Sequence, residues 1–344
     1  MIVVMKSRCT PENVADVRHR LEDLGYLVTE ITGVEKTIMA AVGGEDYTKV
    51  DSIDQLKALD WVEDVMVITK PYRFVALEYK PERTIIDLGD GVKIGGNEVC
   101  IMAGPCTVES EEQLFETAAA VAKSGAKVLR GGAYKPSTSP YSFQGMGVPG
   151  LKLLKAAAEK YGLKVITEVM DPRKIELVSE YSDILQIGTR NMQNYDLLRE
   201  LGHCGKPIML KRGMSARYEE WLLAAEYVAS GGNEQIIFCE RGVRSFETGT
   251  RNMLDIAAVP VMKSLSHLPM VIDPSQGTGK RDLVKAMSLA GVAAGADGLL
   301  IEVHPNPDHA IKDGSQSVTI ADYEAMLTPI KAVANAIGRT VSTN

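Results

Sequence analysis

The chain has 344 residues, of which 24% are charged and 45% hydrophobic, and its formal net charge is -7. These values are typical of a globular protein with one large domain and one small one, and the acidic balance argues against a general nucleic-acid binder. Five cysteines without a CxxC spacing argue against a disulfide framework, and no signal peptide or membrane-spanning run is recognisable, so we expect a cytoplasmic protein with neither nucleic acid nor membrane as a partner.

Residues 1–70 are predicted to form a small α+β domain. Apolar spacing and turn residues give the order βαββαβ, which is the ferredoxin-like (ACT-like) pattern. Thr10-Pro11 is an N-cap followed by proline at the first helical position, and Gly25 ends that helix. The last strand is expected at 62–68. Domains of this kind often bind small molecules, so by analogy of fold we expect a sensor.

Residues 71–98 are predicted to be a linker followed by a hairpin. The segment Lys70–Pro81 holds two prolines and separates the first domain from the rest. Two glycine turns, at 89–91 and 95–97, mark the hairpin within residues 85–100. We expect this hairpin to close the bottom of the fold that follows.

Residues 99–340 are predicted to form an α/β fold, a (β/α)8 TIM barrel, because eight apolar strands alternate with helices. The strands are expected at 99–103, 127–130, 164–168, 184–187, 207–211, 235–239, 269–273 and 298–302. Helix starts are expected at Ser110, Asp171-Pro172 and Ser215. A doubly wound sheet is the rival fold, but no GxGxxG follows the first strand.

Basic residues stand at or beyond several of these strand ends. They are Arg130, Arg190, Lys211 and Arg241, with Lys135 in the long loop after the second strand. The carboxyl ends of barrel strands build the active site of a TIM barrel, and loops as long as residues 131–145 are usually functional. Taken singly, each charge could be a solvated loop residue. Together they predict a site for a small polyanion, since guanidinium and ammonium groups bind phosphate and carboxylate.

Three further residues are candidate metal ligands. Cys106 follows the first barrel strand, Glu302 ends the eighth, and Asp313 lies in the loop after it. Mixed sulfur and oxygen ligands suit a borderline divalent metal such as Mn, Fe, Co or Zn. The alternative roles are a buried thiol for Cys106, a salt-bridge partner for Glu302 and a turn residue for Asp313. His304 and His309 lie nearby, and we expect them at the surface.

Several motifs together resemble type I-beta DAHP synthase, over nearly the whole chain. They are AGPC (103–106), LRGGAYKP (129–136), SPYSFQG (139–145), QIGTRN (186–191), LKRG (210–213), CERG (239–242), DPS (273–275) and IEVHP (301–305). That family condenses phosphoenolpyruvate with erythrose 4-phosphate in the first step of the shikimate pathway. Its feedback-inhibited members carry a ferredoxin-like domain, which implies an aromatic amino acid effector and a homo-oligomer, a tetramer, for this chain.

The resemblance also implies roles for the candidate residues. Phosphoenolpyruvate and the phosphorylated aldose would be held by Arg130, Lys135, Pro136, Ser137, Thr138, Arg190, Lys211 and Arg241. Cys106, Gln276, Glu302 and Asp313 occupy the metal-binding positions, and Lys135 and Cys106 are the implied catalytic residues. The metal would orient or polarise the aldehyde.

Two residues depart from the family pattern. The family has histidine, a metal ligand, where this chain has Gln276, and an amide oxygen is a poorer ligand, so we expect weak metal binding. The family has arginine in KPRTS where this chain has Ser137, which removes a charge and a fork of donors. Two alternatives therefore stay open: a paralogous enzyme that joins phosphoenolpyruvate to a different aldehyde, and a ligand-sensing protein with a weakened site.

Overall fold

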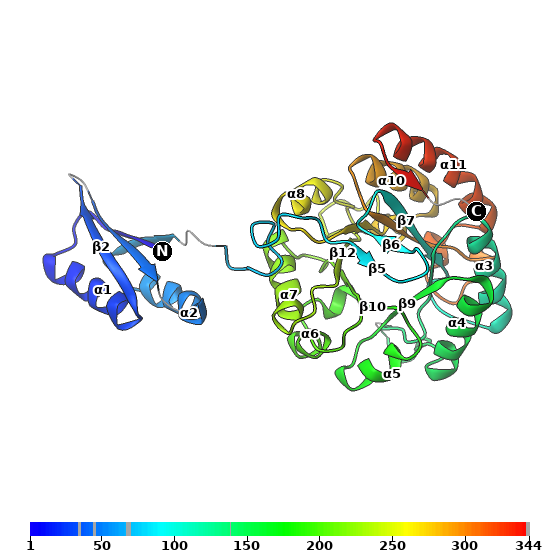
Figure 1. Cartoon of the computed structure of the whole chain (residues 1–344), viewed down its shortest axis with the longest axis horizontal. Helices are drawn as coiled ribbons and strands as arrows, with labels where there is room; N and C mark the ends of the chain where they lie inside the picture. Colours follow the sequence, from blue (N-terminus) through cyan, green and yellow to red (C-terminus); the bar gives the residue numbers. More distant parts are fainter. Residues whose placement is uncertain (34–35, 44–45, 67–69, 138, 342–344) are drawn as a thin grey trace. The chain divides into compact units, whose positions relative to one another are not determined.

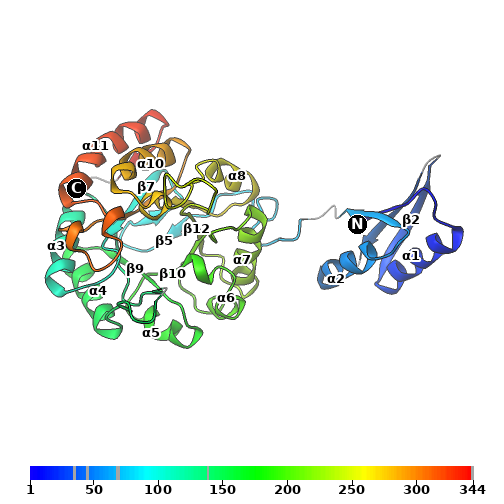
Figure 2. The ribbon, with the colours of Figure 1, turned by 180° about the vertical axis from the view of Figure 1, so that it is seen from behind.

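The computed structural model describes residues 1–33, 36–43, 46–66, 70–137 and 139–341. They form two compact units, one ending at Pro71 and the other beginning at Tyr72. Figure 1 and Figure 2 show the chain from opposite sides. Within the described ranges, the structure contains no helix with the length and hydropathy needed to cross a bilayer.

The N-terminal unit has the predicted ferredoxin-like order of elements. These are β1 (Ile2–Met5), α1 (Pro11–Asp23), β2 (Tyr26–Thr32), β3 (Thr37–Gly43), α2 (Asp46–Lys57) and β4 (Val62–Met66). The strands form an antiparallel sheet in the order β2-β3-β1-β4, and buried side chains of α1 and α2 pack on it. The strand expected to reach residue 68 ends at Met66, and residues 67–69 lie outside the described ranges. Thr10 caps α1 as predicted, through its hydroxyl and the N–H of Asn13.

The second unit is a closed barrel of eight parallel strands, as predicted. The strands are β7 (Glu98–Gly104), β8 (Val128–Arg130), β9 (Lys164–Glu168), β10 (Ile184–Ile187), β11 (Ile208–Lys211), β12 (Ile236–Glu240), β13 (Met270–Ile272) and β14 (Gly298–Glu302). Each pairs with the next, and β14 pairs with β7 to close the ring. In Figure 1 the helices lie outside the strands. A short strand, β15 (Thr340–Val341), adds to β7.

Helices connect consecutive strands around the barrel. They are α3 (Glu111–Lys123), α4 (Val148–Tyr161), α5 (Ile175–Ser179), α6 (Tyr195–Leu201), α7 (Tyr218–Ser230), α8 (Ala258–Leu265), α9 (Pro274–Thr278), α10 (Arg281–Ala293) and α11 (Ile320–Ala336), with one-turn helices η1 (Pro172–Lys174), η2 (Thr189–Asn191), η3 (Pro307–His309) and η4 (Gly314–Gln316). Ser110 caps α3 and Asp171 caps η1, as predicted. The helix expected to start at Ser215 starts at Tyr218 instead, because the Glu220 carboxylate accepts the N–H of Arg217, 2.7 Å away, and fixes the first turn there.

The bottom of the barrel is filled, so a cavity can open only at the other end. The predicted hairpin forms from β5 (Ile86–Asp87) and β6 (Lys93–Ile94). Its apolar side chains share a buried cluster with the inward-facing residues of the strands. Those inward residues are Cys100, Met102, Val128, Ile166, Ile184, Met209, Ile237, Cys239, Val271 and Leu300. The polar residues at the carboxyl ends of the strands therefore face the open end.

The segment before the hairpin is fastened to the barrel. The Glu226 carboxylate on α7 accepts three consecutive backbone N–H groups, those of Arg73, Phe74 and Val75, at 2.8 to 3.1 Å. Farther along, the ring of buried His267 contacts both the Thr84 hydroxyl and the Phe74 carbonyl. The part of the predicted linker from Tyr72 onward thus belongs structurally to the barrel.

Candidate active site

A polar cavity of about 370 Å³ opens at the carboxyl ends of the barrel strands. It gathers residues from segments that are far apart in the sequence, because parallel strands end at the same rim of a barrel. Of the predicted site residues, those lining it are Lys135, Pro136, Ser137, Arg190, Lys211, Arg241, Gln276 and Asp313. Thr138 lies outside the described residues.

Arg130 and Cys106 lie at a smaller recess, which Lys135 and Gln276 also line. Arg130, at the end of β8, is buried, and its Nη1 lies 2.9 Å from Glu302 Oε1. Burial alone lowers the pKa of Arg130, but Glu302, Cys106 and Asp273 together outweigh burial and raise it. Its Nε has no hydrogen-bond partner among the described residues. A fixed cation with a spare donor therefore lies beneath the main cavity.

Lys211, at the end of β11, is 1% exposed and reaches across the barrel. Its Nζ lies 2.6 Å from Asp273 Oδ2 and 3.1 Å from Gln276 Oε1. Burial raises the pKa of Asp273, but the Lys211 ammonium outweighs burial, so the pKa lies below its usual range. The pair is charged, and the Lys211 ammonium has a third donor for a ligand.

Arg241 follows β12 and is the least compensated of the buried cations. It is 5% exposed, and its Nε has no hydrogen-bond partner among the described residues. Among the described residues, the side chain makes one hydrogen bond, from Nη1 to the Gly242 carbonyl at 3.4 Å. Burial lowers the pKa of Arg241, which is the effect of holding a guanidinium away from water without a close carboxylate. Such a group is a strong candidate to bind an anionic ligand.

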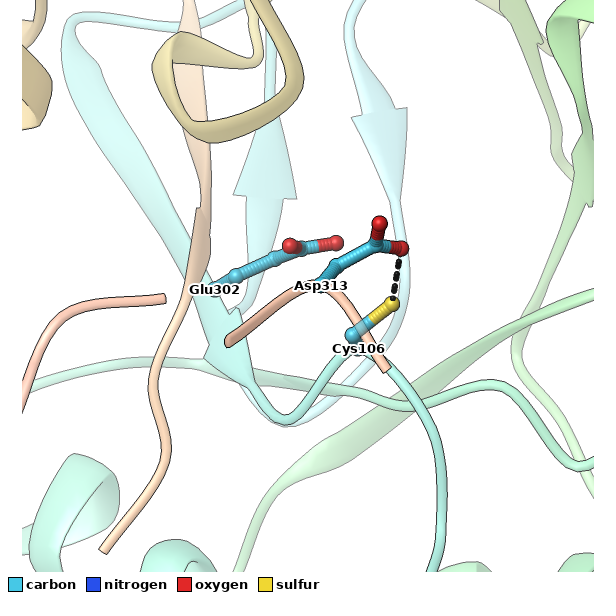
Figure 3. Close-up of side chains that lie close together, drawn as sticks. All are labelled: Cys106, Glu302 and Asp313. Atoms are coloured by element: carbon cyan, nitrogen blue, oxygen red, sulfur yellow. Dashed lines mark hydrogen bonds between the residues drawn. The ribbon is translucent and has the colours of Figure 1, made fainter. Parts of the chain in front are cut away.

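The three predicted ligands Cys106, Glu302 and Asp313 come together, as Figure 3 shows, with their ligand atoms within 4.8 Å of one another. The Cys106 thiol lies 2.9 Å from Asp313 Oδ2, and Lys135 Nζ lies 2.6 Å from the Cys106 sulfur. Burial raises the pKa of the Cys106 thiol, as does the neighbouring Glu302. Asp313 has a left-handed backbone with φ +53°, which is uncommon outside glycine.

This cluster fits a borderline divalent metal. One sulfur and two carboxylates are the mixed donors such ions accept, and ligand atoms this close can share one ion. Glu302 is also held from outside, since Gln316 Nε2 donates to its Oε2 at 2.7 Å. Outer contacts of this kind orient metal ligands.

Gln276, the fourth predicted ligand, faces the cluster with its nitrogen. Its Oε1 accepts from Lys211, and its Nε2 lies 3.5 Å from Glu302 Oε1. An amide nitrogen has no lone pair for a metal, so in this orientation Gln276 contributes a hydrogen-bond donor. The residue links the Lys211 ammonium to the Glu302 carboxylate.

Ser137 and the two histidines do not contact the cluster. The Ser137 hydroxyl donates to the Phe143 carbonyl at 2.7 Å and thereby ties the β8–α4 loop to itself. His304 is buried rather than at the surface, because its Nε2 faces Glu109 Oε2 at 3.3 Å, so that expectation was wrong. His309 is exposed on η3, as expected.

Sequence reasoning assigned no role to Glu168, at the end of β9. Its carboxylate lines both cavities, and its Oε1 has no hydrogen-bond partner in the part of the chain described. Burial raises the pKa of Glu168, although the surrounding Lys135 and Lys211 oppose the rise. The same strand-end position that drew attention to the cations could have identified it.

Three more cations line the cavity and were not predicted. Arg244 and Arg251 lie on the β12–α8 loop, and Lys312 on the β14–α11 loop. Arg251 lies 3.4 Å from Asp313 Oδ1 and 3.1 Å from Gln316 Oε1. None of the three ends a strand, so the strand-end position that identified the other cations could not identify these.

Comparison with known proteins places these features in a family context. The DAHP synthetase I family model matches residues 82–338, and a model described as the DAHP synthase ferredoxin-like domain matches residues 1–70. Phospho-2-dehydro-3-deoxyheptonate aldolase of Thermotoga maritima is 47% identical over 342 residues, covering 99% of this chain and 100% of that protein. Its crystal structure matches with a TM-score of 0.95 over 99% of both chains. A 2-dehydro-3-deoxyphosphooctonate aldolase of Syntrophotalea carbinolica is 33% identical, covering 70% of this chain and 93% of its own length.

Replacing Lys211 by methionine is expected to destabilise the fold, because Asp273 would be left buried and unpaired. We expect the free energy of unfolding at pH 7 to fall by about 3 kcal/mol. The pKa of Asp273 is lower in the folded protein than in the unfolded chain. The pair therefore stabilises the fold fully at pH values above the ordinary aspartate pKa. This stabilisation is lost as the pH falls through the pKa of Asp273 in the folded protein.

Urea unfolding of Lys211→Met and of the wild type at pH 7 measures this loss. The exposed Lys152→Met is the control, expected within about 0.5 kcal/mol of the wild type. Equal stabilities of the two variants would contradict the assigned pairing.

Proposed function

The chain belongs to the DAHP synthetase I family, and from this premise we propose that its barrel condenses phosphoenolpyruvate with erythrose 4-phosphate. The products are 3-deoxy-arabino-heptulosonate 7-phosphate and inorganic phosphate, the first step of the shikimate pathway. The observation that carries the proposal is the buried, poorly compensated Arg241 among Lys211, Lys135 and Arg190. A cavity of this charge suits a substrate with a phosphate and a carboxylate.

Binding of phosphoenolpyruvate is assigned to the buried cations. Lys211 has one ammonium donor beyond those used by its two partners, and Arg241 has an Nε without a partner among the described residues. Arg130 adds positive charge from the smaller recess. Arg190 lines the same cavity at its rim. Holding both anionic groups fixes the position of C3, which is the reacting carbon, and removes the entropy cost of aligning it.

In the reaction, C3 of phosphoenolpyruvate forms a bond to the aldehyde carbon. The aldehyde oxygen becomes an alkoxide and takes a proton, which Lys135 is placed to donate. Water adds at C2, and the C2–O bond to phosphate breaks with the electron pair leaving on phosphate. We assign Glu168 to the proton released by that water, because its buried carboxylate, whose Oε1 has no hydrogen-bond partner among the described residues, holds a proton more readily than an exposed one.

Cys106, Glu302 and Asp313 are proposed to hold the divalent metal, as Mn, Fe, Co or Zn. When bound, the metal supplies a Lewis acid for the aldehyde oxygen. Gln276 is proposed to remain hydrogen-bonded to Lys211 and Glu302, so metal binding is weak. Ser137 stands where the family pattern has arginine, and its hydroxyl is used within the loop, so aldehydes other than erythrose 4-phosphate should be tested as well.

The N-terminal unit is proposed to regulate the barrel. The cavity and the Cys106 cluster are built from residues of the barrel unit. Tyrosine or phenylalanine is the proposed effector, bound between domains of different subunits in a homotetramer. The five free cysteines favour the reducing cytoplasm as the location.

Phosphate release from phosphoenolpyruvate and a panel of aldehydes, with and without Mn²⁺, tests the proposed function. Erythrose 4-phosphate is expected to give the highest kcat/KM. A higher value with another aldehyde would establish the paralogous activity, and binding of phosphoenolpyruvate without turnover of any aldehyde would favour the sensor.

Replacing Gln276 by histidine is expected to strengthen metal binding, because imidazole replaces an amide that presents nitrogen to the cluster. We expect the dissociation constant for Mn²⁺ or Zn²⁺ to fall at least about tenfold, because a direct ligand should matter no less than an outer contact that orients one, whose loss costs about 10–100-fold. Equilibrium dialysis with elemental analysis measures it, with Gln276→Asn as the control. A wild-type protein that keeps one tightly bound metal per chain would contradict this prediction.

Removing residues 1–71 is expected to leave a folded, active barrel, since the unit from Tyr72 onward has its own core. The truncated protein should not respond to tyrosine or phenylalanine, whereas the full chain should be inhibited, with a coupling of about 1–3 kcal/mol. Initial rates with and without each amino acid measure this. A full chain that ignores both would contradict the sensor role, and a folded truncate without activity would contradict the division of labour.

A further inference from the structure

Arg212 and Glu240 form a buried ion pair on the outer side of the barrel, directly beside two cations of the cavity. Successive side chains of a strand point to opposite faces. On β11 and β12, Met209 and Cys239 face the barrel interior, so Lys211 and Arg241 also point inward. Arg212 and Glu240, each one position away, point outward and meet with Nη1 2.9 Å from Oε2.

The pair is enclosed by further polar contacts. Arg212 Nη1 also lies 2.8 Å from Asp255 Oδ2, and its Nε donates to the Ala216 carbonyl at 2.9 Å. Tyr218 donates its hydroxyl to the same Asp255 oxygen at 2.6 Å, and the Arg212 guanidinium lies over the Tyr218 ring. All these groups lie outside the cavity, so none of them contacts a ligand there.

Glu240 fixes the backbone on both sides of Arg241. Its carboxylate Oε1 accepts the N–H of Gly242, and its carbonyl accepts the N–H of Asp273 at 2.8 Å. Gly242 has φ +89° and leaves no room for a Cβ, which would lie 2.7 Å from that of Asn252. The turn that carries Arg241 is therefore held chiefly by Glu240. The Arg241 side chain adds only the 3.4 Å contact from Nη1 to the Gly242 carbonyl, and its Nε has no partner among the described residues.

We propose that Arg212 and Glu240 are positioning residues for anion binding: they hold Lys211 and Arg241 in the cavity at the spacing that phosphoenolpyruvate requires. The proposal rests on the proposed function for the identity of the anion. Among the described residues, the Arg241 guanidinium makes one long hydrogen bond, from Nη1 to the Gly242 carbonyl, and it can turn away once that turn is released. Loss of the outer pair then lowers affinity for phosphoenolpyruvate and leaves the handling of the aldehyde largely intact.

Two substitutions separate the parts of this network. Glu240→Gln keeps an oxygen that can accept the Gly242 N–H and removes the charge opposite Arg212, whereas Glu240→Leu removes both. We expect the dissociation constant for phosphoenolpyruvate to rise about tenfold in Glu240→Gln and about a hundredfold in Glu240→Leu, by analogy with the range known for outer contacts that orient metal ligands. The KM for phosphoenolpyruvate should rise in parallel, while the KM for the aldehyde changes less than about threefold.

Lys263→Met is the matched control. Lys263 lies 2.9 Å from the buried Asp297, whose carboxylate accepts the N–H of Met270 at the start of β13, at the opposite end of the barrel. Asp297 keeps a second ion pair, with Arg339 Nη2 at 3.2 Å, so the fold should survive the substitution. The change does not touch the cavity, and we expect an unchanged dissociation constant for phosphoenolpyruvate.

Calorimetric titration of the full chain with phosphoenolpyruvate, and separately with inorganic phosphate, decides the matter. The ranking of wild type, then Glu240→Gln, then Glu240→Leu supports the proposal; where Glu240→Leu does not fold, a tenfold loss in Glu240→Gln supports it. The proposal is overturned if the Glu240 variants bind phosphoenolpyruvate within twofold of the wild type. It is also overturned if Lys263→Met loses as much affinity as they do. A wild type that binds phosphate but not phosphoenolpyruvate refutes the proposed function, and the ranking for phosphate then tests the positioning role alone. Absence of binding to either anion overturns both.

Discussion

The site depends on keeping positive charge at the end of a barrel, where little water reaches it. A buried guanidinium or ammonium is costly unless a carboxylate lies close by. The barrel meets this constraint by pairing across strands: Arg130 of β8 with Glu302 of β14, and Lys211 of β11 with Asp273 beyond β13. Arg241 lacks such a partner among the described residues, and the anion binding that we propose for the cavity follows from this imbalance.

The twofold alternation of side chains along a strand arranges these charges in two layers. Inward-facing side chains at the strand ends line the cavity, and outward-facing side chains pack against the surrounding helices and loops. The filled interior and the hairpin of β5 and β6 leave a cavity only at the other end. Long-range contacts such as Arg130 with Glu302 follow from ring closure, because β14 pairs with β7 beside β8.

The sequence was sufficient to predict the barrel, because each strand is a short, mostly apolar run that ends in, or is followed directly by, a charged or glycine residue. It also placed Cys106, Glu302 and Asp313 at one rim, since all parallel strands end there. The partners of these residues were not predictable. Whether Gln276 presents oxygen or nitrogen depends on Lys211, and the pairing of Arg212 with Glu240 depends on strand register. Arg244 and Arg251 lie within a loop, where no periodic pattern indicates direction.

The uncompensated guanidinium of Arg241 also links the lifetime of the protein to its ligand supply. A cavity with excess buried charge raises the free energy of the ligand-free fold, and an anion that binds only the folded form lowers it by mass action. In a cell, the fraction of molecules open to proteolysis then decreases as the anion accumulates. Abundance of the enzyme would thus follow its substrate through degradation rate alone, without any change in synthesis.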